Sequence, residues 1–151
     1  MDDPFLSAME NVPAGPLLGL DLGTKTIGVA VTSEGRSLAT PVTTIKRQKF
    51  TKDVEQLLSL AKERDIVGLI LGLPLNMDGS EGPRAQSARA FARNLARHTD
   101  LPVAFWDERL STAAAERELI ALDTSRKKRE SLIDQMAATH ILQGALDRLN
   151  R

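Results

Sequence analysis

The sequence predicts one α/β domain with a five-stranded mixed sheet and helices on both faces. A chain of 151 residues fits a single ordinary domain. The first third carries three short runs rich in β-branched residues, separated by turn-forming residues, which indicates hairpin-linked strands. The remainder alternates short apolar runs with segments of helical periodicity, and this alternation is typical of parallel strands joined by helices.

The N-terminal part is expected to be a leader followed by three strands. Residues 1–16 hold three prolines and no periodic apolar pattern, so we expect a flexible leader and a domain spanning 17–151. The expected strands cover residues 17–21, 26–32 and 38–45, with turns at 23–25 and 33–36. Pro41 cannot donate to a strand ladder, which places the third strand at an edge or next to a bulge.

The remaining elements follow from changes in the apolar period. Helices are expected over residues 50–64, 83–97 and 112–121, with a last helix ending near residue 150. Strands are expected over residues 66–71 and 102–106, with a polar loop at 72–82. The expected order is therefore β-β-β-α-β-α-β-α-α.

Composition narrows the kinds of site that the chain can build. It has no cysteine and only two histidines, so a bound metal should have oxygen ligands. A net charge of zero argues against coating nucleic acid by bulk charge but permits a basic patch beside an acidic site. No apolar run is long enough to span a bilayer, and the N-terminus lacks the basic start of a signal peptide. We expect no membrane association and a cytoplasmic location.

Three carboxylates occupy positions that a purely structural design avoids. Asp21 closes an apolar strand, Glu108 directly follows the last strand, and Asp134 lies on the apolar face of the last helix. Burying such groups is costly unless they are paired, protonated or metal-bound. If the topology brings them together, two divalent cations would relieve their repulsion and support phosphodiester cleavage. Mg²⁺ or Mn²⁺ suits ligands of this kind.

Other interpretations of these carboxylates stay open from the residues alone. Asp21 fits an ordinary turn, and Asp107 competes with Glu108 for the same role. Asp134 fits an ion pair with Arg129 or Arg109.

Two basic segments are candidates for binding phosphate. Lys25 lies in the tight turn after Asp21, where glycines permit close approach of a phosphate backbone. The stretch 126–129 (RKKR), which contains Lys127 and Lys128, puts four positive charges at the start of a helix. The helix dipole disfavours cations there, and an incoming phosphate would relieve the conflict. A solvated charge run is the alternative.

The glycine-rich stretch after the first strand resembles two phosphate-binding motifs that do not fit. Thr24 separates Gly23 from Lys25, which breaks the P-loop signature. Actin-like and sugar-kinase ATPases share such a loop but need two domains around the nucleotide, and this chain has room for one.

Four stretches together resemble the YqgF family of RuvC-related pre-16S rRNA nucleases and Holliday junction resolvases. They are 19–30 (GLDLGTKTIGVA), 72–82 (GLPLNMDGSEG), 106–112 (WDERLST) and 133–138 (IDQMAA). The resemblance covers about residues 17–149 and implies an RNase H-like fold with a divalent-metal nuclease site at Asp21, Glu108 and Asp134. Thr26 departs from the family, which often has arginine there.

From the residues and the resemblance we expect a nuclease that hydrolyses phosphodiester bonds, with RNA favoured over structured DNA. Processing the 5′ end of pre-16S rRNA is the implied role, carried out with two Mg²⁺ or Mn²⁺ ions. The substrate-binding candidates are Lys25, Asn76, Arg109, Ser111, Thr112, Lys127 and Lys128. One alternative is a Holliday junction resolvase, which needs a homodimer rather than a monomer. Another is a non-catalytic ribosome- or RNA-binding factor.

Overall fold

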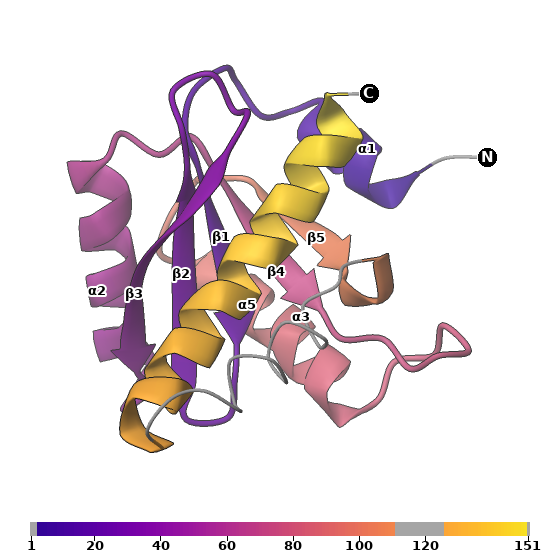
Figure 1. The fold of residues 1–151 in the computed structure, drawn as a ribbon. Coiled ribbons are helices and arrows are strands. Elements are labelled where there is room, and N and C mark those ends of the chain that lie inside the picture. The colour runs from indigo at the N-terminus through magenta and orange to yellow at the C-terminus, as the bar shows by residue number, and fades with distance from the viewer. Residues whose placement is uncertain (1–2, 111–125, 151) are drawn as a thin grey trace.

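A mixed five-stranded sheet with a long helix lying across one face forms the centre of the fold (Figure 1). A computed structural model describes residues 3–110 and 126–150, with the side chains of 126–134 excepted. The elements, in chain order, are α1 (Pro4–Met9), β1 (Leu17–Leu22), β2 (Thr26–Thr32), β3 (Ala39–Lys46), α2 (Phe50–Glu63), β4 (Gly68–Leu73), α3 (Pro83–Leu95), β5 (Val103–Asp107), the short 3-10 helix η1 (Glu108–Leu110) and α5 (Arg126–Leu149). The helix expected over 112–121 lies outside the described residues.

The strand order is β3-β2-β1-β4-β5, which confirms the predicted mixed sheet. Strands β1, β2 and β3 pair antiparallel, as expected of hairpin-linked strands. Strand β1 pairs parallel with β4, and β4 pairs parallel with β5. The carboxyl ends of these three strands therefore meet at one edge of the sheet. Strand β3 is an edge strand, and its ladder with β2 shifts register next to Pro41, as predicted.

Each face of the sheet packs against a different helical layer. Successive side chains of a strand alternate between the two faces. Leu18 and Leu20 of β1 belong to the apolar cluster that includes residues of α2 and α3. Leu17 belongs to the opposite cluster, which is built with α1 and α5. Asp21 shares the parity of Leu17, so it lies on the face that α5 covers.

Glycine at position 19 lets α5 lie close to β1. A Cβ added to Gly19 would be 2.7 Å from the Leu142 Cβ and 3.2 Å from the Ala138 carbonyl oxygen. Figure 1 shows α5 starting at the edge where β1 ends and crossing the sheet to the opposite edge. This close approach fixes the position of α5 against the strand that carries Asp21.

Two features of the structure differ from the sequence expectations. The segment 1–16, expected to be a flexible leader, contains α1, whose Phe5 packs edge-on against Trp106 with ring centroids 5.2 Å apart. Strand β4 begins at Gly68 rather than at 66, because the Ile66 amide donates to the Ala61 carbonyl at the end of α2.

Helix α5 begins at Arg126, so the basic stretch 126–129 forms its first turn, as expected of charges at the start of a helix.

No helix in the described part of the chain is both long and apolar enough to cross a membrane.

We expect Gly19→Ala to lower the free energy of unfolding by about 1–3 kcal/mol, the usual cost of overpacking a well-packed contact. Denaturant unfolding followed by circular dichroism measures the change. Gly35→Ala is the matched control, because a Cβ at Gly35 meets no atom within 4 Å. The control should stay within about 0.5 kcal/mol of wild type. Equal stability of the two variants would contradict the close contact between α5 and β1.

Candidate active site

Asp21 lies near the end of β1, where it is 5% exposed. On one side it pairs with Gly28 of β2. On the other side, the preceding residue Leu20 pairs with Leu71 of β4, and the residue that follows Leu71 is Gly72. Because its partner on β2 is a glycine, that strand places no side chain directly opposite Asp21.

The Glu108 carboxylate lies over the same glycine of β4. A Cβ added to Gly72 would be 3.1 Å from Glu108 Oε2 and 3.2 Å from its Cδ. Glu108 reaches this position because β5 ends one residue earlier and Trp106 of β5 pairs with Gly72. Asp21, near the end of β1, and Glu108, directly after β5, therefore lie at the same edge of the sheet and on the same face.

Asp107 is excluded from this pair by strand alternation and by its own partner. Ala104 and Trp106 face α5, so the intervening residues of β5, and Asp107 at its end, face the other way. The Arg109 guanidinium donates to the Asp107 carboxylate at 2.7 Å through Nη2 and at 3.0 Å through Nε. This hydrogen bonding lowers the pKa of Asp107. Asp107 is therefore an ionised, paired residue at the back of the site, and Glu108 shares the face of Asp21.

The third predicted carboxylate lies on a helix that reaches this edge. Residue 134 stands one helical turn before Ala138, whose carbonyl oxygen lies against Gly19. Because α5 starts where β1 ends, this turn is displaced from Gly19 toward Asp21 (Figure 1). The side chain of Asp134 lies outside the described part. Among the described residues, no group of three or more His, Cys, Asp or Glu side chains is placed to hold a metal ion.

The turn after Asp21 is held by hydrogen bonds from three directions. The Gly23 amide donates to the Thr26 carbonyl at 2.8 Å, which closes the turn on itself. Arg47 donates its backbone amide to the Lys25 carbonyl at 2.8 Å and its Nη1 to the Gly23 carbonyl at 2.6 Å. Arg84 donates Nη2 to the Leu22 carbonyl at 3.3 Å. Lys25 itself is exposed at the tip of the turn.

Arg47 and Arg84 were not among the sequence candidates. A signal for Arg47 was present, because residues 46–52 (KRQKFTK) hold four cations and no acid. Cations at the start of a helix indicate an anionic partner for residues 46–52 as they do for residues 126–129. Arg84 had no comparable signal, because its proximity to the turn depends on how α3 packs.

The other substrate-binding candidates lie in or against the loop after β4, or their side chains are outside the described part of the chain. Asn76 is exposed and donates Nδ2 to Ser80 Oγ at 3.0 Å within that loop. Arg109 donates Nη1 to the Met77 carbonyl at 3.2 Å, so it links the loop to η1. Ser111 and Thr112 lie outside the described residues. Lys127 and Lys128 are in the first turn of α5, and their side chains are outside the description.

The sheet and its acidic edge place the chain in the RNase H-like class. Two solved structures of RuvC from Thermus thermophilus, one in complex with Holliday junction substrate, have TM-scores of 0.55 and 0.53 to this chain. Their sequence identities are 12% and 15%, and they cover 90% and 89% of this chain and 96% of each RuvC chain. At these identities the likeness establishes the fold.

The chain belongs to the RuvX family, described as Holliday junction resolvase, whose model matches residues 15–148. This confirms the resemblance to YqgF. A protein of Rhodopseudomonas palustris strain BisA53 is 70% identical over 99% of this chain and 94% of its own length. One of Bradyrhizobium diazoefficiens is 64% identical, with coverage of 97% and 91%. One of Cereibacter sphaeroides is 62% identical, with coverage of 98% and 91%. All three carry the name "Putative pre-16S rRNA nuclease". The chain is therefore an enzyme of a nuclease family.

We expect Gly72→Ala to lower kcat for nucleic-acid cleavage by about 10- to 100-fold, because small displacements of catalytic groups carry costs of this size. The new Cβ would lie 3.1 Å from the Glu108 carboxylate and 2.6 Å from Ile141 Cδ1, so it would displace both side chains. Cleavage at saturating substrate measures the effect, at a temperature where circular dichroism shows the variant folded.

Gly82→Ala is the control, because its Cβ would make only ordinary contacts at 3.5 Å with Asn76. A folded Gly72→Ala variant that cleaves at the wild-type rate would show that the carboxylate position over Gly72 is irrelevant to catalysis.

Proposed function

We propose that this protein is a divalent-metal-dependent nuclease that hydrolyses phosphodiester bonds in RNA, with maturation of the pre-16S rRNA 5′ end as its role. The observation that carries the proposal is the placement of Asp21 and Glu108 on the same face of the sheet, at the edge where the carboxyl ends of the parallel strands meet. The names of its relatives favour RNA over DNA as substrate.

The residues at this edge fit Mg²⁺ or Mn²⁺. Asp21 and Glu108 offer only carboxylate oxygens, which both cations accept, and neither cysteine nor histidine lies among them. Asp134, on the turn of α5 that is displaced toward Asp21, is proposed as the third ligand. With two such ions bound, the site would gain a means of activating water and of stabilising the leaving oxygen.

The chain's own residues offer contacts for a polyanion at this edge. Lys25 is proposed to contact a substrate phosphate at the tip of the turn. Arg109 is largely neutralised by Asp107, so we assign it chiefly to holding the loop after β4. Phosphate contacts of this kind position a substrate without reading its sequence.

A Holliday junction resolvase with the same chemistry is the second candidate, favoured by the description of the family model. Symmetric cleavage of a four-way junction requires two active sites and therefore a dimer. A non-catalytic RNA-binding factor is the third candidate, and it predicts no dependence on the carboxylates.

We expect Asp21→Asn and Glu108→Gln each to reduce cleavage by more than about 100-fold, because removing a metal ligand costs more than the 10- to 100-fold typical of its outer partners. Asp107→Asn is the matched control. It should retain most activity, because Asp107 pairs with Arg109 on the other face. Labelled RNA, single-stranded DNA and a four-way junction, each with Mg²⁺ or Mn²⁺, are the substrates.

The pattern of cleavage separates the candidates. Cleavage of RNA supports the proposal, and preferential paired cuts in the junction by a dimer would replace it with the resolvase. Wild-type activity in Asp21→Asn on every substrate would remove the metal site altogether.

A further inference from the structure

A basic edge surrounds the turn that follows Asp21. Lys46, the last residue of β3, pairs with Thr26 across the sheet, beside the start of β2. Arg47 follows it and donates two hydrogen bonds to the turn. Arg84, at the start of α3, donates Nη2 to the Leu22 carbonyl just before the turn. Together with Lys25, these residues bring four cations to the carboxyl end of one strand.

Neither arginine is neutralised by its contact. Both donate to backbone carbonyls, which carry no net charge. Ion pairs in the described part of the chain include Arg89–Glu81, Arg109–Asp107 and Arg148–Asp3, and neither Arg47 nor Arg84 has an ion pair there. A guanidinium has five N–H donors, so a carbonyl bond leaves most of its hydrogen-bonding capacity for another partner.

Cations also lie at the starts of the helices that begin at this edge of the sheet. Lys49 and Lys52 lie at the start of α2, and Arg84 lies in the first turn of α3. Neither N-cap residue makes a side-chain hydrogen bond, and the first turn of α2 also contains the buried acid Asp53, which accepts a hydrogen bond from the Gln48 amide. Helix α5 begins with the basic stretch 126–129 and has no acid in its first turn. The helix dipole disfavours cations at all three positions, whereas an anion at the edge would interact favourably with both the dipoles and the charges.

We propose that Arg47 and Arg84 bind consecutive stretches of a substrate's phosphodiester backbone where they contact the turn after Asp21. The strand would then run along this edge of the sheet from the start of α2 to the start of α3, past the carboxyl end of β1, whose Asp21 side chain lies on the face that α5 covers. The inference rests on the proposed function, because it takes the bound strand to be the one that is cut. It assigns two residues to substrate binding that the sequence candidates did not include.

Binding without cleavage tests this assignment separately from the nuclease activity. The affinity of wild type for a labelled single-stranded RNA is measured in EDTA from about 20 to 200 mM salt. Each phosphate contact contributes a slope of about 0.7 to log K against log salt for single strands. Arg47→Gln and Arg84→Gln should each lower the slope by about 0.7, which corresponds to about fivefold weaker binding at 0.1 M salt.

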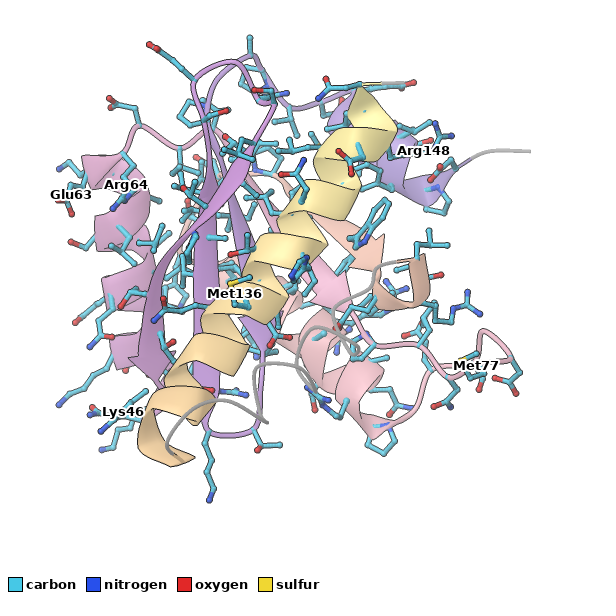
Figure 2. The ribbon with its side chains drawn as sticks, viewed as in Figure 1. Lys46, Glu63, Arg64, Met77, Met136 and Arg148 are labelled. Atoms are coloured by element: carbon cyan, nitrogen blue, oxygen red, sulfur yellow. The ribbon has the colours of Figure 1, made fainter. Side chains whose placement is uncertain are left out.

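Arg64→Gln is the matched control, because Arg64 is an exposed arginine at the other end of α2. Figure 2 shows Arg64 beside the upper end of α2 and Lys46 well below it, near the lower end of that helix. The control should leave both affinity and slope unchanged. A DNA strand of the same sequence should show the same slope changes, because phosphate contacts do not distinguish the two backbones.

A purely structural role for the two arginines predicts a different outcome. Loss of the Gly23 and Leu22 carbonyl bonds alone would lower Tm and kcat, and Arg47→Lys would not repair the slope. The proposal expects Arg47→Lys to restore the slope, and it expects the glutamine variants to raise KM with kcat largely kept. If Arg47→Gln fails to fold, Arg84→Gln and Arg47→Lys decide the question.

Three results would overturn the assignment. The folded glutamine variants could keep the wild-type slope, their slope could change only as much as that of Arg64→Gln, or wild type could fail to bind RNA at 20 mM salt. If the slopes change as expected while wild type cleaves no substrate, the assignment stands and the nuclease proposal fails. If wild type cleaves a substrate while the slopes of the variants are unchanged, the nuclease proposal stands and the assignment of Arg47 and Arg84 fails.

Discussion

The close approach of α5 to the sheet is the constraint on which the site depends. Three glycines permit it: Gly19 lies against Ala138 and Leu142, Gly72 against Ile141, and Gly144 against the Trp106 indole. An added Cβ would lie within 3.2 Å of an α5 or Trp106 atom at each position. Protein interiors are close-packed, so they contain no void that could hold the extra atom. The same glycine, Gly72, also makes room for the Glu108 carboxylate. The contact between α5 and the sheet at Gly72 therefore determines both how the helix packs and where the Glu108 carboxylate lies.

Charge is distributed so that the acidic centre and its surroundings have opposite signs. The net charge of the chain is zero, yet Asp21 and Glu108 lie at an edge where α2, α3 and α5 all begin with cations. Such an arrangement lowers the repulsion that a polyanion would otherwise meet at a carboxylate site. It also explains why a whole-chain charge says little about the ligand, since the field near a site is set by its neighbours.

The sequence predicted the elements whose signals are local and missed those that depend on packing. Strand β2 and helix α2 follow from β-branched and helical periodicity and were placed within a residue of their bounds. Helix α1 has six residues, too short for a period, and depends on Phe5 reaching Trp106. Arg84 could not be predicted because only the docking of α3 brings it to Leu22. Asp21 was singled out because it closes an apolar strand and Glu108 because it directly follows one, and their role as metal ligands stays a prediction.

The register of β5 decides whether Asp107 or Glu108 lies on the same face of the sheet as Asp21. Both follow the same apolar strand, and no composition or spacing rule separates them. The alternation of β5 does, because Trp106 faces α5 and so turns Asp107 toward Arg109. A slip of one residue would exchange the two carboxylates and put Asp107 on the face of Asp21 in place of Glu108. The parallel pairing of Gly72 with Trp106 fixes that register, so the sheet places Glu108, and not Asp107, on the face of Asp21.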